Sequence, residues 1–447
     1  MKTRNFIFIL AASIMLCFNS CKKETVDVTE LLTTVPSSAS GVVVFNMEGL
    51  LEDAGCKIKD REITPSPELQ TLIDKVPGRK ADLMMLFKGD TGIEPKGAVL
   101  FNDAKRWFLS VALYDVDKFC NYIEKNKGLK FSDAGSGVKI AGNYAVKGAQ
   151  AWVCLSVGKS IDADAIASYA SLKPSQSFMV LPMGEKLLTE EDDIRGWALT
   201  NLLLDQVINY RNKNMYKLAL GFIFEDAESI KFSIDFKKGE LESEAVVLNS
   251  KGKPAKCQLP TDKVNVSTLK TLGNTCDMMV AFNVTPKLVK KFQQISESFG
   301  GALLPDIGET LKNIDGTVGL ATCGKNESLS VNGVITTNGD PSQMLKDMLS
   351  EYVGPVSMDG KLLRFSKGDV KGNLTVEYCA EELKGCCLGI IMDGSGSSSM
   401  GYQEQAPQGF QDMSVKLKPE DGGLELEIEG HTTNPKENAL MAIIKSL

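Results

Sequence analysis

The run GVVVFN (residues 41–46) is followed later in the chain by a similar run, DMMVAFN (residues 277–283). Both runs are apolar, both end in Phe-Asn, and a predicted helix comes after each. Short apolar runs bounded by turn residues are typical of buried strands. The sequence therefore predicts that one strand and the helix after it occur twice in the chain.

Further matches follow in the same order along the chain. They pair residues 109–111 with 329–331, residues 137–140 with 360–363, and Cys154-Leu155 with Cys387-Leu388. The paired positions lie between 220 (329 − 109) and 237 (282 − 45) residues apart. No single match is specific, but their common order indicates a tandem duplication.

The predicted fold class is α+β, with two tandem duplicated halves at residues 35–255 and 256–447. Each half is expected to hold a mainly antiparallel sheet with helices packed on one face. Each half also ends in a long hairpin, in which apolar residues alternate with polar ones at 230–248 and 415–428. A period of two predicts one buried and one wet face. A closing helix is expected at residues 438–447.

One stretch has no evident counterpart in the second half. Residues 189–216 are rich in apolar side chains, including Trp197, and we predict a helical insertion there. The corresponding place after Gly394 is a Gly/Ser stretch typical of a flexible loop. This insertion is the first place to look for a function peculiar to the protein. The alternative is a helix that caps the sheet or the seam between the halves.

The amino terminus has the pattern of an export signal. Lys2 and Arg4 precede an apolar run at residues 6–18, and Ser20 precedes Cys21. The apolar run is shorter than the roughly 20 residues that span a membrane. It resembles bacterial lipoprotein signals, whose peptidase cuts before a cysteine that carries lipid. We predict a signal peptide at residues 1–20, lipid on Cys21 and a tether at 21–34; Cys17 is disfavoured because bulky Leu16 precedes it.

The exported part resembles uncharacterised lipoproteins of the Bacteroidota that carry a domain of unknown function. The resemblance is carried by FNSCKK (residues 18–23), by VPSSASGVVVF (residues 35–45) and by the order of elements. It implies an envelope location, membrane attachment through lipid on Cys21, and the fold. In lipoproteins with such signals, an aspartate after the lipidated cysteine retains the protein at the inner membrane. Position 22 is a lysine, which favours the outer membrane. Whether the protein faces the periplasm or the cell surface is left open.

Composition argues against several classes of function. The formal net charge is −7 and the pI is near 5.2, which disfavours nucleic acid as a partner. Eleven cysteines are present, but no C-x-x-C occurs, so neither a zinc ribbon nor a dithiol redox centre is predicted. Most cysteines are expected to be small buried hydrophobes, and one or two disulfides remain open.

The sequence also offers little for catalysis. His431, the single histidine, is expected in an exposed turn, and one histidine excludes multi-histidine zinc sites. The acidic cluster at residues 190–193 is interpreted as a solvated helix start. The glycine-rich stretches lack a strand–loop–helix setting for phosphates. No metal site and no cofactor are therefore predicted.

These observations favour a non-catalytic binding or structural module of the cell envelope, with a glycan or an envelope protein as the partner. Trp107, Trp152 and Trp197 are speculative ligand-binding residues, because tryptophans can stack on sugars; burial in the core is the alternative. The competing hypothesis is a carboxylate-dependent glycan hydrolase. It requires two buried acids that face a cleft, at least one with a raised pKa.

Overall fold

The computed structural model describes most of the chain from Val28 onward. The described residues are 28–59, 61–75, 87, 89–103, 105–156, 161–207, 217, 220–298, 307–324, 328–394 and 409–446. The predicted signal peptide, Cys21 and the Gly/Ser stretch at 395–399 lie outside these residues.

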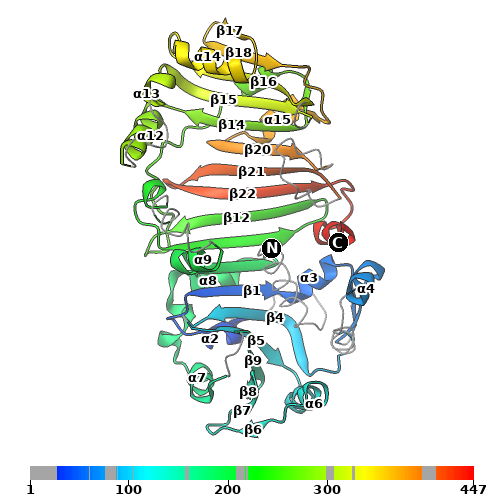
Figure 1. The fold of residues 1–447 in the computed structure, drawn as a ribbon. Helices are drawn as coiled ribbons and strands as arrows, with labels where there is room; N and C mark the ends of the chain where they lie inside the picture. The colour runs from blue at the N-terminus through cyan, green and yellow to red at the C-terminus, as the bar shows by residue number, and fades with distance from the viewer. Residues whose placement is uncertain are drawn as a thin grey trace.

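The protein is an α+β structure built on one 18-stranded sheet in which every pairing is antiparallel (Figure 1). The amino-terminal part contributes, in order across the sheet, β12 (Glu240–Leu248), β11 (Ser229–Phe236), β10 (Ile194–Leu199), β1 (Gly41–Asn46), β4 (Ile93–Asn102), β5 (Trp107–Leu113), β9 (Gln150–Cys154), β8 (Tyr144–Lys147), β7 (Lys139–Ala141) and β6 (Ser132–Asp133).

The carboxy-terminal part continues the same sheet on the other side of β12. Its strands are, in order, β22 (Gly423–Thr432), β21 (Phe410–Glu420), β20 (Leu388–Asp393), β14 (Met278–Val284), β15 (Ile314–Cys323), β16 (Ser330–Thr337), β18 (Leu362–Lys367) and β17 (Val356–Asp359). Small two-stranded sheets are formed by β2 (Lys57–Lys59) with β3 (Glu62–Thr64) and by β13 (Thr275–Cys276) with β19 (Leu374–Thr375).

The expectation of a separate sheet in each half is therefore wrong. The two parts join where β12 pairs with β22, from Glu240 opposite His431 to Val246 opposite Glu425. Both strands belong to the predicted terminal hairpins. Because each hairpin would otherwise leave an unpaired edge, pairing them satisfies both rows of backbone groups.

The strand pairings also correct one of the sequence matches. The pairs of β1 with β10 and β4 resemble those of β14 with β20 and β15. β1 lies between β10 and β4, and β14 lies between β20 and β15, so β20 takes the place in the second part that β10 takes in the first. The match of Cys154 with Cys387 had equated the region of β20 with β9, which pairs with β5 further out in the sheet.

Helices cover both faces of the sheet, so the prediction of helices on one face is wrong. On the face seen in Figure 1 lie α3 (Met47–Asp53), α4 (Pro67–Asp74), α6 (Val116–Lys127), α12 (Pro286–Ser298), α13 (Ile307–Thr310), α14 (Gln343–Tyr352) and α16 (Ala439–Ser446). On the opposite face lie α2 (Thr29–Thr33), α7 (Ala163–Tyr169), α8 (Pro182–Thr189), α11 (Val266–Leu269) and α15 (Val376–Glu382). The physical reason is visible in β1, where the neighbours Val44 and Phe45 are both buried but join different cores.

The predicted helical insertion at 189–216 is also wrong in its centre. Residues Ile194–Leu199 form β10, between β1 and β11, and Trp197 lies on this strand. The strand is buried on both faces, so it lacks the alternation that marks a half-buried strand. Helix α9 (Thr200–Val207) follows it, and residues 208–216 lie outside the described residues.

The folded part begins earlier than the predicted tether allows. Val28, Leu31 and Leu32 are buried, and Leu31 and Leu32 belong to α2. The stretch 28–34 is thus part of the fold. Among the described residues, no helix has the length and apolar character needed to cross a bilayer.

Candidate functional site

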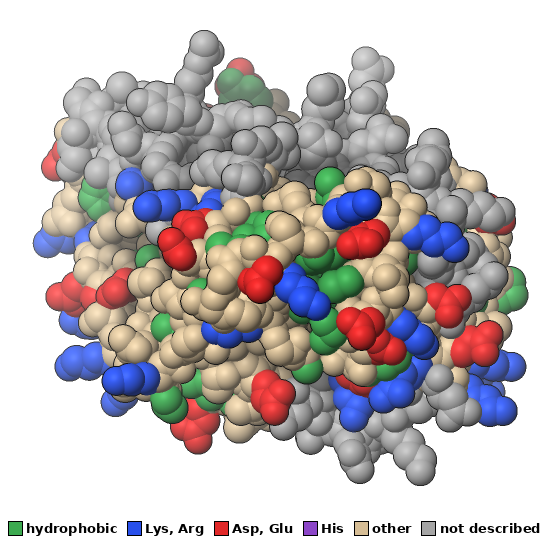
Figure 2. All heavy atoms as spheres, turned by 90° about the horizontal axis from the view of Figure 1, so that it is seen from below, with side chains coloured by type: hydrophobic (Ala, Val, Ile, Leu, Met, Phe, Trp, Pro, Cys, Tyr) green, Lys and Arg blue, Asp and Glu red, His purple; other side chains and the backbone are tan. Residues whose placement is uncertain are grey.

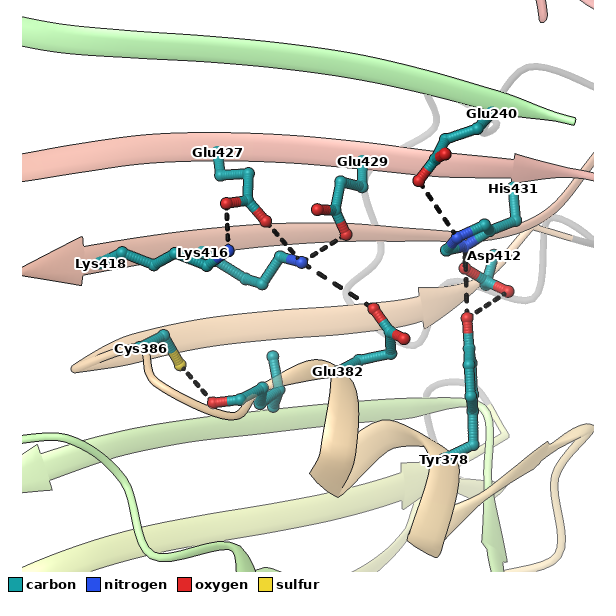
Figure 3. Close-up of polar contacts among 11 residues, drawn as sticks. Glu240, Tyr378, Glu382, Cys386, Asp412, Lys416, Lys418, Glu427, Glu429 and His431 are labelled. Carbon is teal, nitrogen blue, oxygen red and sulfur yellow. Dashed lines mark hydrogen bonds and ion pairs between the residues drawn. The ribbon is translucent and has the colours of Figure 1, made fainter. Parts of the chain in front are cut away.

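A group of charged side chains lies on the sheet face opposite the one seen in Figure 1, where the two parts join (Figure 3). Strand pairing places Lys416 opposite Glu427, and Glu427 opposite Glu244. Two rows further along the same face, Asp412 lies opposite His431, which lies opposite Glu240. Side chains of directly paired residues share a face. Antiparallel pairing therefore builds this cluster, which we name the seam cluster, from alternate residues of three strands.

Lys416 is the central cation of the seam cluster, and it is only 3% exposed. Its Nζ lies 2.7 Å from Glu427 Oε1 and 3.8 Å from Glu382 Oε2 on α15, and it also pairs with Glu429. Burial works to lower the pKa of Lys416, but its hydrogen bonds with Glu427 and Glu429 outweigh that effect and raise it. The ammonium group is thus permanently charged at neutral pH.

The two glutamates around Lys416 have opposite pKa shifts. Burial works to raise the pKa of Glu427, but hydrogen bonds from Glu429, Lys416 and Lys418 lower it to about 2. Burial and the shared hydrogen bond with Glu427 raise the pKa of Glu429 to about 7. One proton is therefore readily held between the two carboxyl groups near neutral pH.

His431 is not in an exposed turn, contrary to the prediction. It lies on β22, because the strand continues to Thr432. Its Nδ1 is 2.8 Å from Asp412 Oδ1, and Asp412 is only 1% exposed. Its Nε2 lies 3.6 Å from Glu240 Oε1. The hydroxyl of Tyr378 on α15 donates to Asp412 Oδ2 at 3.1 Å and lies 3.2 Å from His431 Nδ1.

This arrangement favours a charged imidazole over a catalytic base. The hydrogen bond with Asp412 raises the pKa of His431 against the effect of burial. Both ring nitrogens face carboxylates, so neither nitrogen is left to take a proton from a substrate. Burial and the charge of Asp412 also raise the pKa of Tyr378, which keeps its hydroxyl protonated. The histidine ties α15, β21, β22 and β12 together.

A second pair of acids meets part of the requirement for carboxylate catalysis. Burial raises the pKa of Asp53 to about 7 and that of Asp193 to about 8, and their carboxyl groups share a hydrogen bond. However, the Asn438 amide donates to Asp53 Oδ1 at 2.6 Å, and the Phe236 backbone N–H donates to Asp193 Oδ2 at 2.9 Å. Glycosidases hold their two carboxyl groups about 5 Å or more apart. The contacts of this pair instead attach α16 to the first part.

The acidic cluster at residues 190–193 was predicted to begin a helix, and this prediction is wrong. Glu190 follows the last residue of α8, and Asp193 is the residue before β10. Asp193 is 4% exposed, and Glu190 pairs with Lys231 of β11. The cluster connects the end of α8 to the start of β10. The sequence did not reveal this connection, because the apolar residues that follow were interpreted as a helix.

The tryptophans do not form a sugar-binding platform. Trp152 is fully buried and Trp197 is 8% exposed, both in the core beneath α2 and α8. Trp197 packs on Phe178, with ring centroids 5.5 Å apart. Trp107, at the start of β5, is half-buried. Apolar strand residues at these positions face the core, so stacking on a ligand is unsupported for Trp152 and Trp197.

All nine cysteines in the described part of the chain are free thiols. Burial raises the pKa of Cys56 to about 11 and that of Cys386 to about 12, which makes both thiols poor nucleophiles. The Sγ atoms of Cys276 and Cys379 lie 3.8 Å apart in the core beneath α15. Within the described residues, no group of three or more His, Cys, Asp or Glu side chains has a geometry that would hold a metal ion.

A shallow site lies at the lower end of the molecule. An open hollow of about 520 Å³ lies beside α6 and is lined by Asn121, Glu124, Lys125, Gly128 and Lys130. These residues come from one helix and the turn after it, so no groups converge from opposite walls. Figure 2 shows this end of the molecule with acidic and basic side chains mixed over the surface.

Comparisons with known proteins add little to this picture. No protein family matches the chain, and no curated protein does. Among solved structures, three crystal forms of TP0453 align over 78–79% of this chain and 95–96% of that one, at 9–10% identity. Their TM-scores are 0.28 to 0.30, too low for an argument about fold or function.

Proposed function

We propose that the protein is a lipid-anchored, non-catalytic binding module of the cell envelope, attached to the outer membrane through lipid on Cys21. The proposal rests first on the resemblance of residues 1–23 to a lipoprotein signal. The start of the described fold is compatible with it, because only the residues between Cys21 and Val28 separate the anchor from Val28, the first described residue, which is buried. Extended, this segment reaches about 25 Å, so the folded part would stay close to the bilayer.

We also propose that the fold arose by tandem duplication. The support is the common order of pairing, in which β12-β11-β10-β1-β4-β5-β9 parallels β22-β21-β20-β14-β15-β16-β18. Helices at matching places in this order, α2 and α11, precede β1 and β14. The duplication makes the seam between the halves the natural place for a partner.

The observation that carries the non-catalytic reading is the internal pairing of the seam cluster. His431, Lys416 and Tyr378 each contact carboxylates of the same cluster. A catalytic group must instead be available to a substrate. Turnover of a defined glycan or peptide by the purified protein, lost in Asp53→Asn or in His431→Gln, would overturn this reading.

The anchor is tested by metabolic labelling with an alkyne fatty acid, followed by membrane fractionation. Cys21→Ala is expected to abolish the label, and Cys17→Ala is the matched control that should retain it. Label that persists in Cys21→Ala but disappears in Cys17→Ala would place the lipid on Cys17 instead. The absence of label in the unsubstituted protein would refute the lipid anchor.

The side of the membrane is tested by protease treatment of intact cells, with permeabilised cells as the control. Digestion of intact cells would place the module outside, where a glycan or a host protein is the expected partner. Protection until permeabilisation would place it in the periplasm, with an envelope protein as the expected partner. Sedimentation with inner-membrane markers would contradict the outer-membrane location.

A further inference from the structure

The central strands carry apolar side chains on the face opposite the seam cluster. Cross-strand pairing arranges them in rows, because residues directly opposite one another point the same way. The rows are Leu388–Leu417–Leu426–Ala245, Ile390–Val415–Ile428–Ser243 and Met392–Met413–Gly430–Leu241. We call this surface the central apolar face.

The central apolar face is open to solvent, in contrast to the charged face behind it. Leu388 is 38% exposed, and the other apolar side chains of β20, β21 and β22 in these rows are half-buried. They belong to none of the hydrophobic cores that the described residues form. On the other face, Lys416 and Glu427 are 3% and 7% exposed. The usual preference for charge outside and hydrocarbon inside is thus reversed here, which marks a binding surface.

Helices border this face without lying across it. Figure 1 shows β20, β21, β22 and β12 with no described helix over them. At one end α16 packs against β12, β22 and α3. At the other end α12 packs through Val289 on the core that contains Phe282, and Phe282 pairs with Leu388. Helices packed on a sheet lie about 10 Å above it. The bordering helices would therefore keep a flat sheet of a partner protein from contacting the strands between them.

The chemistry of the face and its border identifies the occupant. Ser243 is the only polar side chain in the rows, and its hydroxyl already donates to the Ser233 carbonyl oxygen at 3.0 Å. The floor therefore offers a ligand no free side-chain hydrogen-bond donor. On the border helix α12, Lys287 and Lys290 are exposed and form no ion pair with a described residue, and Phe292 is 42% exposed. A slender hydrocarbon with an anionic head matches both features.

We propose that the central apolar face binds the acyl chains of an anionic phospholipid, with the headgroup near the lysines of α12. Unbranched acyl chains are thin enough to lie between the bordering helices and need no polar partner. The transfer of the acyl chains out of water supplies the driving force for binding. The inference goes beyond the anchor, because it assigns a second, reversible lipid contact to the folded part.

The test uses the unlipidated chain from Lys22 onward, which contains every described residue. The protein is incubated with vesicles of phosphatidylglycerol and phosphatidylethanolamine and re-isolated by gel filtration, and the carried phospholipid is quantified by mass spectrometry. We expect about one lipid per chain, enriched in phosphatidylglycerol. Val415→Gln and Leu426→Gln should each lower the carried lipid at least fivefold. Val180→Gln is the matched control, because Val180 is 52% exposed and lies away from this face.

The outcomes separate the alternatives. Lys287→Gln combined with Lys290→Gln should remove the preference for phosphatidylglycerol while leaving lipid bound. Circular dichroism of each variant shows whether it is folded, and an unfolded Gln variant is replaced by Val415→Thr. No carried lipid, equal lipid in the Val415 and Val180 variants, or a lipid-free dimer in gel filtration would overturn the proposal. None of these results depends on Cys21, so they test lipid binding by the folded part independently of the proposed lipid anchor.

Discussion

Replacement of Lys416 by methionine tests how the seam cluster stabilises the fold. Methionine fills a similar volume but removes the cation that Glu427, Glu429 and Glu382 share. Removing one partner of a buried ion pair typically costs 3–5 kcal/mol, because the remaining charge loses its compensation. Lys418 still pairs with Glu427 in the variant, so we expect the lower end, about 3 kcal/mol at pH 8.

The cost should depend on pH in a defined direction. Without Lys416, the pKa values of Glu427 and Glu429 in the folded state rise, so the folded variant binds more protons than the folded parent. Its deficit is then largest above the raised pKa values and shrinks as the pH falls toward the unfolded value. Between pH 8 and pH 5, each unit by which the pKa of Glu429 rises from about 7 changes the stability difference by up to about 1.4 kcal/mol. Glu427, with a pKa of about 2 in the parent, contributes in this window only as far as its pKa rises above 5.

Urea unfolding at pH 5 and pH 8, followed by far-ultraviolet circular dichroism, measures both quantities. Tryptophan fluorescence reports only on the amino-terminal part, because Trp107, Trp152 and Trp197 all lie there. Different midpoints for the two signals would show that the parts unfold separately. The control is Lys384→Met, since Lys384 is 73% exposed and lies 3.9 Å from Glu381; its cost should be below about 0.5 kcal/mol. A loss below about 1 kcal/mol for Lys416→Met, or one independent of pH, would refute the argument.

Two more predictions concern buried groups of the first part. Because the folded pKa values of Asp53 and Asp193 are raised above 3.8, the stability from this pair is present at low pH and lost between about pH 5 and pH 8. Asp53→Asn should therefore make the urea midpoint less dependent on pH in this window, and an unchanged dependence would contradict the shared proton. Trp152→Ala should cost about 3–5 kcal/mol, since the side chain is fully buried, and Trp107→Ala less. Equal costs in thermal or urea unfolding would contradict this packing.

Local patterns in the sequence predicted many elements of the fold. The helix expected at 438–447 is found as α16, because helical spacing is a local property of the sequence. The alternation in residues 230–248 predicted β11 and β12 for the same reason. In contrast, β10 was missed, since a strand buried on both faces has no alternation to detect.

The candidate site depended on information that the sequence does not contain. The pairing of β12 with β22 joins residues about 190 positions apart, from Glu240 to His431. Only this register places His431 between Asp412 and Glu240. The alternating glutamates of β22 were read as a wet face, but charges on neighbouring strands neutralise one another there. The face of β21 and β22 that is more exposed to solvent is the apolar one. Alternation shows that a strand has an apolar and a polar face, but it does not show which of the two is buried.

The pairing of β12 with β22 also has a consequence for the synthesis of the chain. Strand β12 is complete at Leu248, but its partner ends at Thr432, near the end of the chain. Until β22 arrives, the first part exposes an edge of nine residues that could pair with a strand of another molecule. Contacts between such distant residues form slowly. A chain that stops before β22 would therefore keep the edge of β12 open to pairing with another molecule, and the addition of β22 covers that edge.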